Sequence, residues 1–162
     1  MNILKDKKVV ITAGPTYEMI DSVRFIGNMS SGKMGYAIAN SFANSGTNVV
    51  LISGPTYINM PLNDSINVVK VVSADDMYEA CSYYFEEADI FIMAAAVSDY
   101  TPIEQYKGKI KKKSEEMILK LKPTVDILKE LSKNKKSNQI IVGFALETDD
   151  ELVNAVDKLN RK

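Results

Sequence analysis

Five largely apolar runs constrain the fold of this 162-residue chain more strongly than any other feature of its sequence. A strand that is covered on both faces of a sheet is a continuous apolar run, whereas a strand with one wet face alternates. Most of the runs end in glycine or other small residues, as strands that lead into tight turns do. We therefore predict buried strands over residues 8–14, 48–55, 66–73, 89–100 and 139–147.

Segments with helical periodicity lie between these runs. Apolar residues recur every four positions over residues 31–46, and Gly46 provides a C-cap. Ser73 is predicted to cap a helix over 74–88, and two further helices are predicted over 124–134 and 149–162. The order β-α-β-β-α-β, an insertion, then α-β-α predicts an α/β fold: a three-layer α/β/α, Rossmann-like architecture with a mostly parallel sheet.

Residues 100–122 interrupt this alternation. The two segments that flank Lys111–Glu116 alternate in polarity, which predicts a hairpin or arm. A protruding hairpin with unpaired edges is most easily stabilised by a symmetric partner, so we expect a homodimer formed through the arm. A chain of 162 residues can bury one sizeable core but is too short for two ordinary domains, so residues 1–162 are predicted to form one domain.

Composition excludes several classes of function. Twenty basic and twenty-one acidic residues give a net charge of -1, so nothing favours a nucleic-acid or membrane partner. The N-terminal apolar run of about six residues is too short for a signal peptide or a membrane span, which predicts a cytoplasmic protein. The chain has no histidine, which excludes Ser-His-Asp and Cys-His catalysis and removes the usual zinc ligands. Any required metal is then expected to be Mg²⁺ or Mn²⁺. The single cysteine, Cys81, lies at helical spacing with apolar residues and is predicted to be a core thiol.

The predicted strand ends are rich in turn-forming residues. They read "TAGPTYE" at 12–18, "SGPT" at 53–56, "AAAVSDY" at 94–100 and "GFALET" at 143–148. In open α/β sheets ligands bind at the carboxyl ends of the strands, so four such ends together favour a binding site over four unrelated tight turns. None has the pattern G-x-G-x-x-G after the first strand, which disfavours a dinucleotide-binding oxidoreductase.

The stretch "GNMSSGKMG" at 27–35 almost matches a nucleotide-binding P-loop. Gly27, Gly32 and Lys33 fit the pattern, but Met34 stands where a hydroxyl should bind magnesium. A thioether is a poor ligand for a hard cation, so triphosphate hydrolysis by a P-loop is disfavoured. The loop leads into a predicted helix, whose N-terminus suits an anionic ligand.

Taken together, these segments resemble a known family. "ITAGPTYEMIDSVRFIGNMSSGKMGYAIA", "AAAVSDY", "KIKK", "VDIL" and "VGFALET" are similar in order and spacing to phosphopantothenoylcysteine synthetase, the phosphopantothenate-cysteine ligase of coenzyme A biosynthesis. The resemblance extends from about residue 7 to the C-terminus. It implies that CTP activates 4'-phosphopantothenate as an acyl-cytidylate with release of pyrophosphate, and that L-cysteine then displaces CMP. The alternative is a non-catalytic nucleotide-binding fragment or assembly module of the same fold.

The resemblance also assigns roles to individual residues. It implies that Asn28 and Lys109 are catalytic, that Arg24, Asn28 and Ala96 bind substrate, and that Arg24 is directed toward the phosphopantothenate. A phosphate loop is expected at Gly14, Ser30, Ser31 and Gly32. The nucleotide-binding residues implied by the family are Ala94, Ala95, Ala96, Asp99, Lys109, Val125, Asp126, Ile127, Leu128, Phe144, Lys158 and Lys162.

Two departures from the family pattern are expected to matter: the chain stops at Lys162, and Gly27 stands where a serine is common in relatives, which is expected to make the loop more flexible. Family members continue for several dozen residues beyond the position of Lys162, through segments that complete the sheet, so the chain is expected to lack a C-terminal part and to be less than fully active alone. In many bacteria the domain is fused to a flavin-dependent decarboxylase, whereas this chain begins at Met1. A stand-alone ligase form without flavin is therefore expected.

Overall fold

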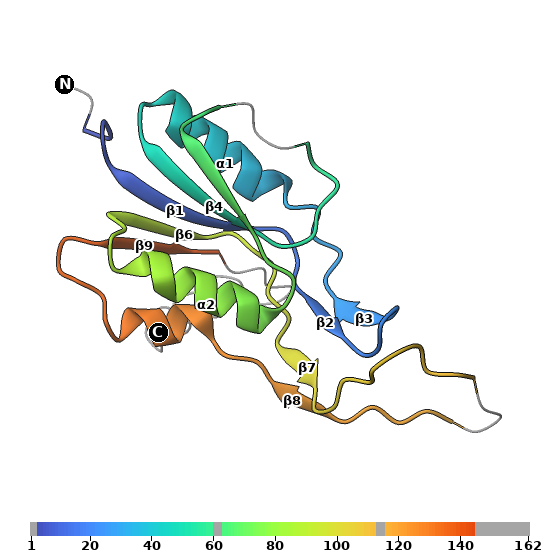
Figure 1. Cartoon of the computed structure of the whole chain (residues 1–162). Helices are drawn as coiled ribbons and strands as arrows, with labels where there is room; N and C mark the ends of the chain where they lie inside the picture. Colours follow the sequence, from blue (N-terminus) through green and yellow to red (C-terminus); the bar gives the residue numbers. More distant parts are fainter. Residues whose placement is uncertain (1–2, 60–62, 113–115, 145–162) are drawn as a thin grey trace, which may run out of the picture.

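The computed structural model describes residues 3–59, 63–112 and 116–144. Its centre is a five-stranded parallel sheet in the order β5-β4-β1-β6-β9 (Figure 1). The strands are β1 (Lys8–Ala13), β4 (Asn48–Ser53), β5 (Ile66–Lys70), β6 (Ile90–Met93) and β9 (Ile140–Gly143). In chain order the sheet strands are therefore arranged 3-2-1-4-5, and the strand order reverses between β1 and β6.

Helices cover both faces of this sheet (Figure 1). Helix α1 (Lys33–Asn44) lies on one face, over a core that includes Val9, Ile11 and Leu51. Helices α2 (Ala74–Phe85) and α3 (Ile127–Ser132) cover the other face, over a core that includes Val10 and Phe91. Because neighbouring residues of β1 face opposite cores, a continuous apolar run is what this central strand requires. The predicted three-layer Rossmann-like α/β fold is confirmed.

The helix ends follow the predicted capping signals. At the end of α1, Gly46 has a φ of 83°, and the amides of Gly46 and Thr47 donate to the carbonyls of Ala43 and Phe42. This is the Schellman arrangement that glycine favours. Ser73 caps α2, because its hydroxyl accepts from the Asp76 amide while the Asp76 carboxylate accepts from the Ser73 amide.

Two small hairpins lie beyond the carboxyl edge of the main sheet. Strands β2 (Tyr17–Met19) and β3 (Phe25–Gly27) pair in antiparallel fashion, although nothing in the sequence led us to predict them. Strands β7 (Tyr100–Pro102) and β8 (Leu121–Pro123) form the base of the predicted arm, which extends away from the sheet (Figure 1). The arm prediction is confirmed, although regular pairing is limited to its base.

Several predicted boundaries were wrong. The strand predicted over 89–100 ends at Met93, because the following residues turn across the end of β1 instead of continuing the sheet. Strands β5 and β9 are less buried than predicted, since each lies at an edge of the sheet. The helix predicted over 124–134 begins only after Asp126, its N-cap. The helix predicted over 149–162 lies outside the described residues.

The described part of the chain also tests the prediction for the single cysteine. Cys81 is fully buried in the core beneath α2, and burial raises the pKa of its thiol to about 12. The prediction of a core thiol is therefore confirmed. No helix among residues 3–59, 63–112 and 116–144 is long and apolar enough to cross a membrane.

Candidate functional site

The ends of β1 and β6 are tied together at the point where the strand order reverses. The Thr12 hydroxyl accepts from the Ala95 amide at 3.1 Å, and the Gly14 carbonyl accepts from the Ala96 amide at 2.8 Å. Thr16 adds two contacts, because its amide donates to the Ala96 carbonyl and its hydroxyl accepts from the Ser98 amide. The segments 12–16 and 95–98, more than 80 residues apart in the chain, thus form one surface, the site floor. It lies at the position where α/β folds bind ligands.

Asn28 lies on this floor. It directly follows β3, and its Nδ2 donates to the Ala96 carbonyl at 2.9 Å. A carboxamide NH₂ has two hydrogens, so this bond fixes the orientation of the side chain and leaves a second donor directed elsewhere. The exposed Asn28 side chain is therefore held ready to donate to a ligand beside Ala96. The structure brings together Asn28 and Ala96, which were both predicted to contact substrate.

The predicted phosphate loop packs against the same floor. Gly32 has a φ of 78°, and a Cβ at this position would lie 3.2 Å from the Gly14 Cα and 2.9 Å from the Thr56 Cγ2. Only glycine allows this close approach with a left-handed backbone. The Ser30 and Ser31 hydroxyls accept from the Gly32 and Lys33 amides at 3.3 and 3.5 Å. These long contacts hold the loop locally.

Helix α1 begins at this loop without a side-chain cap. Its N-cap residue is Gly32, and its first turn contains no acidic residue. The first amides of a helix have no intrahelical acceptor, and the helix dipole concentrates positive charge there. The start of α1 is therefore suited to a phosphate or another anion.

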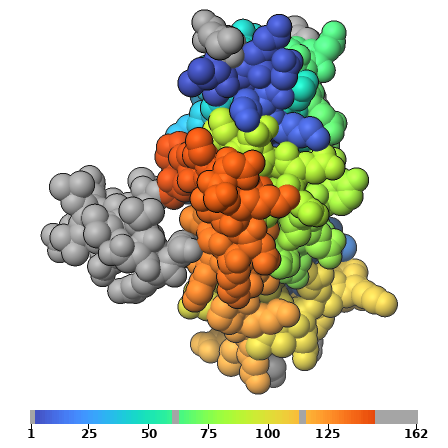
Figure 2. Space-filling model, turned by 90° about the vertical axis from the view of Figure 1, so that its left-hand side faces the viewer, coloured from blue at the N-terminus to red at the C-terminus, as the bar shows by residue number. Residues whose placement is uncertain are grey.

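A cavity of about 200 Å³ opens beside the site floor, next to Ala96. It lies between the ends of β6 and β9 and the start of α3. Its walls contain most of the residues that were predicted to bind nucleotide: Ala95, Asp99, Val125, Asp126, Ile127, Leu128 and Phe144. In Figure 2 the segment from α3 to β9, in orange to red, lies beside α2 and above the base of the arm. Neither Ala94 nor Ala96 lines the cavity.

The start of α3 has a fixed geometry. The Asp126 carboxylate accepts from the Lys129 amide at 3.1 Å, which caps the helix. Thr124, which the sequence did not single out, donates from its hydroxyl to the Ser98 carbonyl at 2.6 Å and from its amide to the Asp99 carbonyl at 2.9 Å. The cavity wall is thus joined to the segment that carries Ala96. Thr124 has no local sequence signal, because its partners are 25 or more residues away.

The remaining described site residues lie in the arm and in the β2–β3 turn. Lys109 is exposed and lies next to Ile110, and Arg24 forms an ion pair with Asp21 at 2.5 Å. The Asp21 carboxylate is buried, and the bond from the Ile110 amide is the main cause that lowers its pKa to about 2. Lys158 and Lys162 lie outside the described residues. The roles predicted for Lys109 and Arg24 remain predictions.

A second cavity, of about 390 Å³, lies at the ends of β4 and β5. It borders "SGPT" at 53–56, which the sequence had marked as a candidate strand end. The Tyr36 and Ser53 hydroxyls form a 3.0 Å hydrogen bond in its wall, and Lys70 lies at its rim. This cavity lies on the other side of β1 from the one lined by Phe144.

The described residues contain no group of three or more acidic or cysteine side chains that could hold a metal ion. Two carboxylates, from Asp99 and Asp126, do line the 200 Å³ cavity. Mg²⁺ is commonly held by one or two carboxylates together with substrate phosphates and water. The oxygen ligands present therefore fit Mg²⁺ that arrives with a nucleotide.

Comparison with known proteins places this site in a family. Residues 4–162 match the family described as DNA/pantothenate metabolism flavoprotein C-terminal domain. The chain is 51% identical over 147 residues to the coenzyme A biosynthesis bifunctional protein CoaBC of Bacillus subtilis, covering 91% of this chain and 36% of that protein. It is 53% identical over 159 residues to a cysteine/cysteine sulfinic acid decarboxylase from an unknown prokaryotic organism, covering 98% of this chain and 44% of that protein.

The same relationship appears in three dimensions. The crystal structure of the C-terminal domain of CoaBC superimposes with a TM-score of 0.86 at 44% identity, covering 99% of this chain and 75% of that domain chain. The chain therefore spans less than half of the two curated relatives and most of this solved domain. From its sequence and its fold, the chain belongs to the family of DNA/pantothenate metabolism flavoprotein C-terminal domains and corresponds to the C-terminal domain of CoaBC.

Proposed function

We propose that this chain is a phosphopantothenate-cysteine ligase domain that uses CTP in coenzyme A biosynthesis. The observation that carries the proposal is the placement of Asn28 on the Ala96 carbonyl, between the uncapped start of α1 and the cavity that ends at Phe144. A side-chain donor, an uncapped helix start and a cavity lined by the residues predicted to bind nucleotide thus lie at the carboxyl edge of the sheet.

The chemistry suits these groups. In the first step an oxygen of the phosphopantothenate carboxylate attacks the α-phosphorus of CTP, the bond to pyrophosphate breaks, and an acyl-cytidylate forms. In the second step the cysteine amine attacks the acyl carbon, the bond to CMP breaks, and the amine loses a proton. A carboxylate is already a nucleophile, so the first step depends mainly on positioning and on stabilising negative charge.

Each group then has a distinct task. The free Nδ2 hydrogen of Asn28 donates to the acyl oxygen, while its other hydrogen remains on the Ala96 carbonyl. The start of α1, with Gly14, Ser30, Ser31 and Gly32, binds phosphate oxygens. The cytidine lies against residues 125–128 and Phe144. Lys109, Lys158 and Lys162 neutralise the triphosphate, and Mg²⁺ enters with the nucleotide.

The arm is proposed to form a homodimer contact. Apolar side chains are exposed along it and at its base, and Ile118 is 82% exposed. The other large ones are Tyr100, Ile103, Tyr106, Met117 and Leu121. A symmetric partner would cover these side chains and the open edges of the hairpin. Arg24, in the β2–β3 turn that bonds to Ile110 of the arm, would then lie near the phosphopantothenate of one of the two subunits.

The proposal is tested by pyrophosphate release with CTP, Mg²⁺, phosphopantothenate and cysteine, using wild type, Asn28→Ala and Lys109→Ala. Loss of one donor to a developing negative charge reduces turnover by about 10²–10³-fold, so we expect a loss of that size for Asn28→Ala. Lys109→Ala is expected to weaken both CTP binding and turnover. If both variants kept full turnover, the site assignment would be wrong. Binding of CTP without any release of pyrophosphate would favour the non-catalytic alternative.

A further inference from the structure

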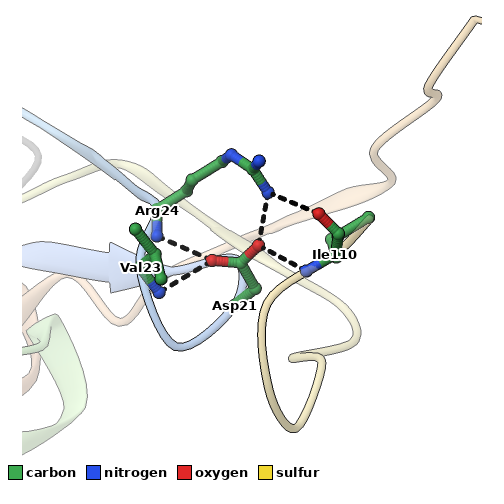
Figure 3. A network of polar contacts seen from close by, with 4 residues as sticks. All are labelled: Asp21, Val23, Arg24 and Ile110. Carbon is green, nitrogen blue, oxygen red and sulfur yellow. Dashed lines mark hydrogen bonds and ion pairs between the residues drawn. The ribbon is translucent and has the colours of Figure 1, made fainter. Parts of the chain in front are cut away.

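The carboxylate of Asp21 joins two separate parts of the molecule (Figure 3). Its Oδ1 accepts from the amides of Val23 and Arg24, at 2.8 and 2.7 Å, and so closes the β2–β3 turn. Its Oδ2 accepts from the Arg24 Nη1 at 2.5 Å and from the Ile110 amide at 3.0 Å. Oδ1 therefore bonds only within the β2–β3 turn, whereas Oδ2 bonds both to Arg24 of the turn and to Ile110 of the arm.

Arg24 completes the attachment of the arm. Its Nη1 also donates to the Ile110 carbonyl at 3.3 Å, so both the amide and the carbonyl of Ile110 are held by side chains of the β2–β3 turn (Figure 3). Close by along the arm, the Tyr106 amide donates to the Ile20 carbonyl at 3.0 Å. The arm is thus fixed to this turn at two points, and Lys109 lies between them in the chain.

The same hairpin carries Asn28. Strand β3 leads from Arg24 to Gly27, and the Phe25 ring stacks on Tyr17 of β2 with centroids 3.7 Å apart. Asn28 then bonds to the Ala96 carbonyl. A short, internally packed element therefore links the anchor of Lys109 at one end to Asn28 at the other.

We propose that Asp21 is a positioning residue, which with Arg24 anchors the Lys109–Ile110 peptide to the β2–β3 hairpin and so sets the place of Lys109 relative to Asn28. This inference rests on the proposed function, because it concerns how Lys109 reaches the nucleotide. It also gives Arg24 a task within its own chain. The carboxylate is fully buried and accepts four hydrogen bonds. Its contacts therefore hold the arm more strongly than an ion pair exposed on the surface would.

Asp21→Asn separates the two halves of this network. The amide oxygen still accepts from Val23 and Arg24, so the turn is kept, but the NH₂ group then faces two donors and accepts from neither. Asp89→Asn is the matched control. Like Asp21, Asp89 accepts from a cationic side chain, that of Lys7, and from a backbone amide, that of Lys8. It directly precedes β6 and so lies at the amino ends of the strands, whereas the arm lies at the carboxyl ends.

The first measurement is hydrogen exchange at the Ile110 amide, together with trypsin cleavage after the lysines at 107–112. For Asp21→Asn we expect exchange and cleavage at least about tenfold faster than in wild type, since the Ile110 amide loses its hydrogen bond to a charged acceptor. Asp89→Asn should leave both rates in the arm unchanged. Equal arm rates in wild type and Asp21→Asn would overturn the anchor.

The second measurement is a double-mutant cycle on ligation with Lys109→Ala. Asp21→Asn alone should lower kcat at least about tenfold, but in the Lys109→Ala background it should have little further effect, since both changes act through one lysine. A full, additive effect in that background would show a general structural role and overturn the positioning of Lys109. A wild-type chain that neither binds CTP nor ligates would instead overturn the proposed function, while the exchange measurement would still decide the anchor.

Discussion

Helices α1 and α2 are both twelve residues long and both begin near the carboxyl edge of the sheet, yet their N-termini are built in opposite ways. The start of α2 is satisfied by the protein itself. Ser73 and Asp76 form a capping box, and the buried Glu18 carboxylate accepts from the Ala74 amide at 2.8 Å. The start of α1 has a glycine N-cap in the left-handed region, no side-chain cap and no acidic residue in its first turn.

This difference makes the start of α1, and not that of α2, suited to an anionic ligand. Capping by side chains and acidic residues stabilises a helix by satisfying its first amides and its dipole. Leaving those groups unsatisfied costs stability, which an anionic ligand restores when it binds. Both helices are held in place by apolar burial against the sheet, so α1 tolerates the missing cap.

The largest effect is expected from adding a side chain at Gly32, the N-cap of α1. In Gly32→Ala a Cβ meets Thr56 and Gly14 and the backbone keeps a φ of 78°, so the loop must shift. We expect the free energy of unfolding to fall by about 2 kcal/mol and the Kd for CTP to rise at least tenfold. Gly46→Ala is the control, because Gly46 has a φ of 83° with no atom within 4 Å of its added Cβ. It should lose stability through backbone strain alone and bind CTP normally; similar CTP affinities in the two variants would contradict the idea.

A charge reversal should separate helix stability from ligand binding. Lys33→Glu places an acidic residue in the first turn of α1, as in α2, so the unfolding free energy should rise by about 0.3–1 kcal/mol. The same charge repels the triphosphate, so the Kd for CTP should rise by about tenfold. Calorimetric titration and urea unfolding would measure the two effects. Asp75→Lys, the mirror change in α2, should lower stability by a similar amount and leave the Kd for CTP unaltered.

The smallest expected effect is a pH dependence confined to the cap of α2. The bond from the Ser73 amide is the main cause that lowers the pKa of Asp76 in the folded state. A lowered pKa contributes stability above the unfolded value near 4, and that stability is lost as the pH falls through the folded value. Asp76→Asn should therefore be less stable than wild type at pH 7, by about 1 kcal/mol or less, and the difference should shrink at pH 3. Urea unfolding at both pH values provides the check, and a gap that grows in acid would exclude this role for Asp76.

Much of the fold could be predicted because its signals are local. The apolar runs of β1 and β4, the cap at Ser73 and the glycine at 46 depend on neighbours within a few residues. The β2–β3 hairpin escaped prediction because its strands are three residues long and its turn is stabilised by Asp21. Strands β5 and β9 were predicted to be more buried than they are. An apolar run does not show whether a strand has a neighbour on both sides.

The strand ends predicted where a ligand site would lie, but roles for individual residues were predicted only through the family resemblance. Residues 125–128 and Phe144 line one cavity, but their physical pattern alone is that of a helix start and a core aromatic. The contacts that organise the site could not be seen in the sequence. Asn28 and Ala96 are 68 residues apart, and Asp21 and Ile110 are 89 residues apart, so no periodicity or spacing rule connects them.

The most direct test of this contrast is a ¹H–¹⁵N NMR titration of the chain with Mg²⁺-CTP. We expect progressive shifts of the backbone amides at 32–35, at the start of α1, and at 95–99, 125–128 and 144, around the cavity. The amides at 73–77, at the capped start of α2, should not move. Shifts at the start of α2, or none at the start of α1, would contradict the proposal that the N-terminus of α1 binds the nucleotide.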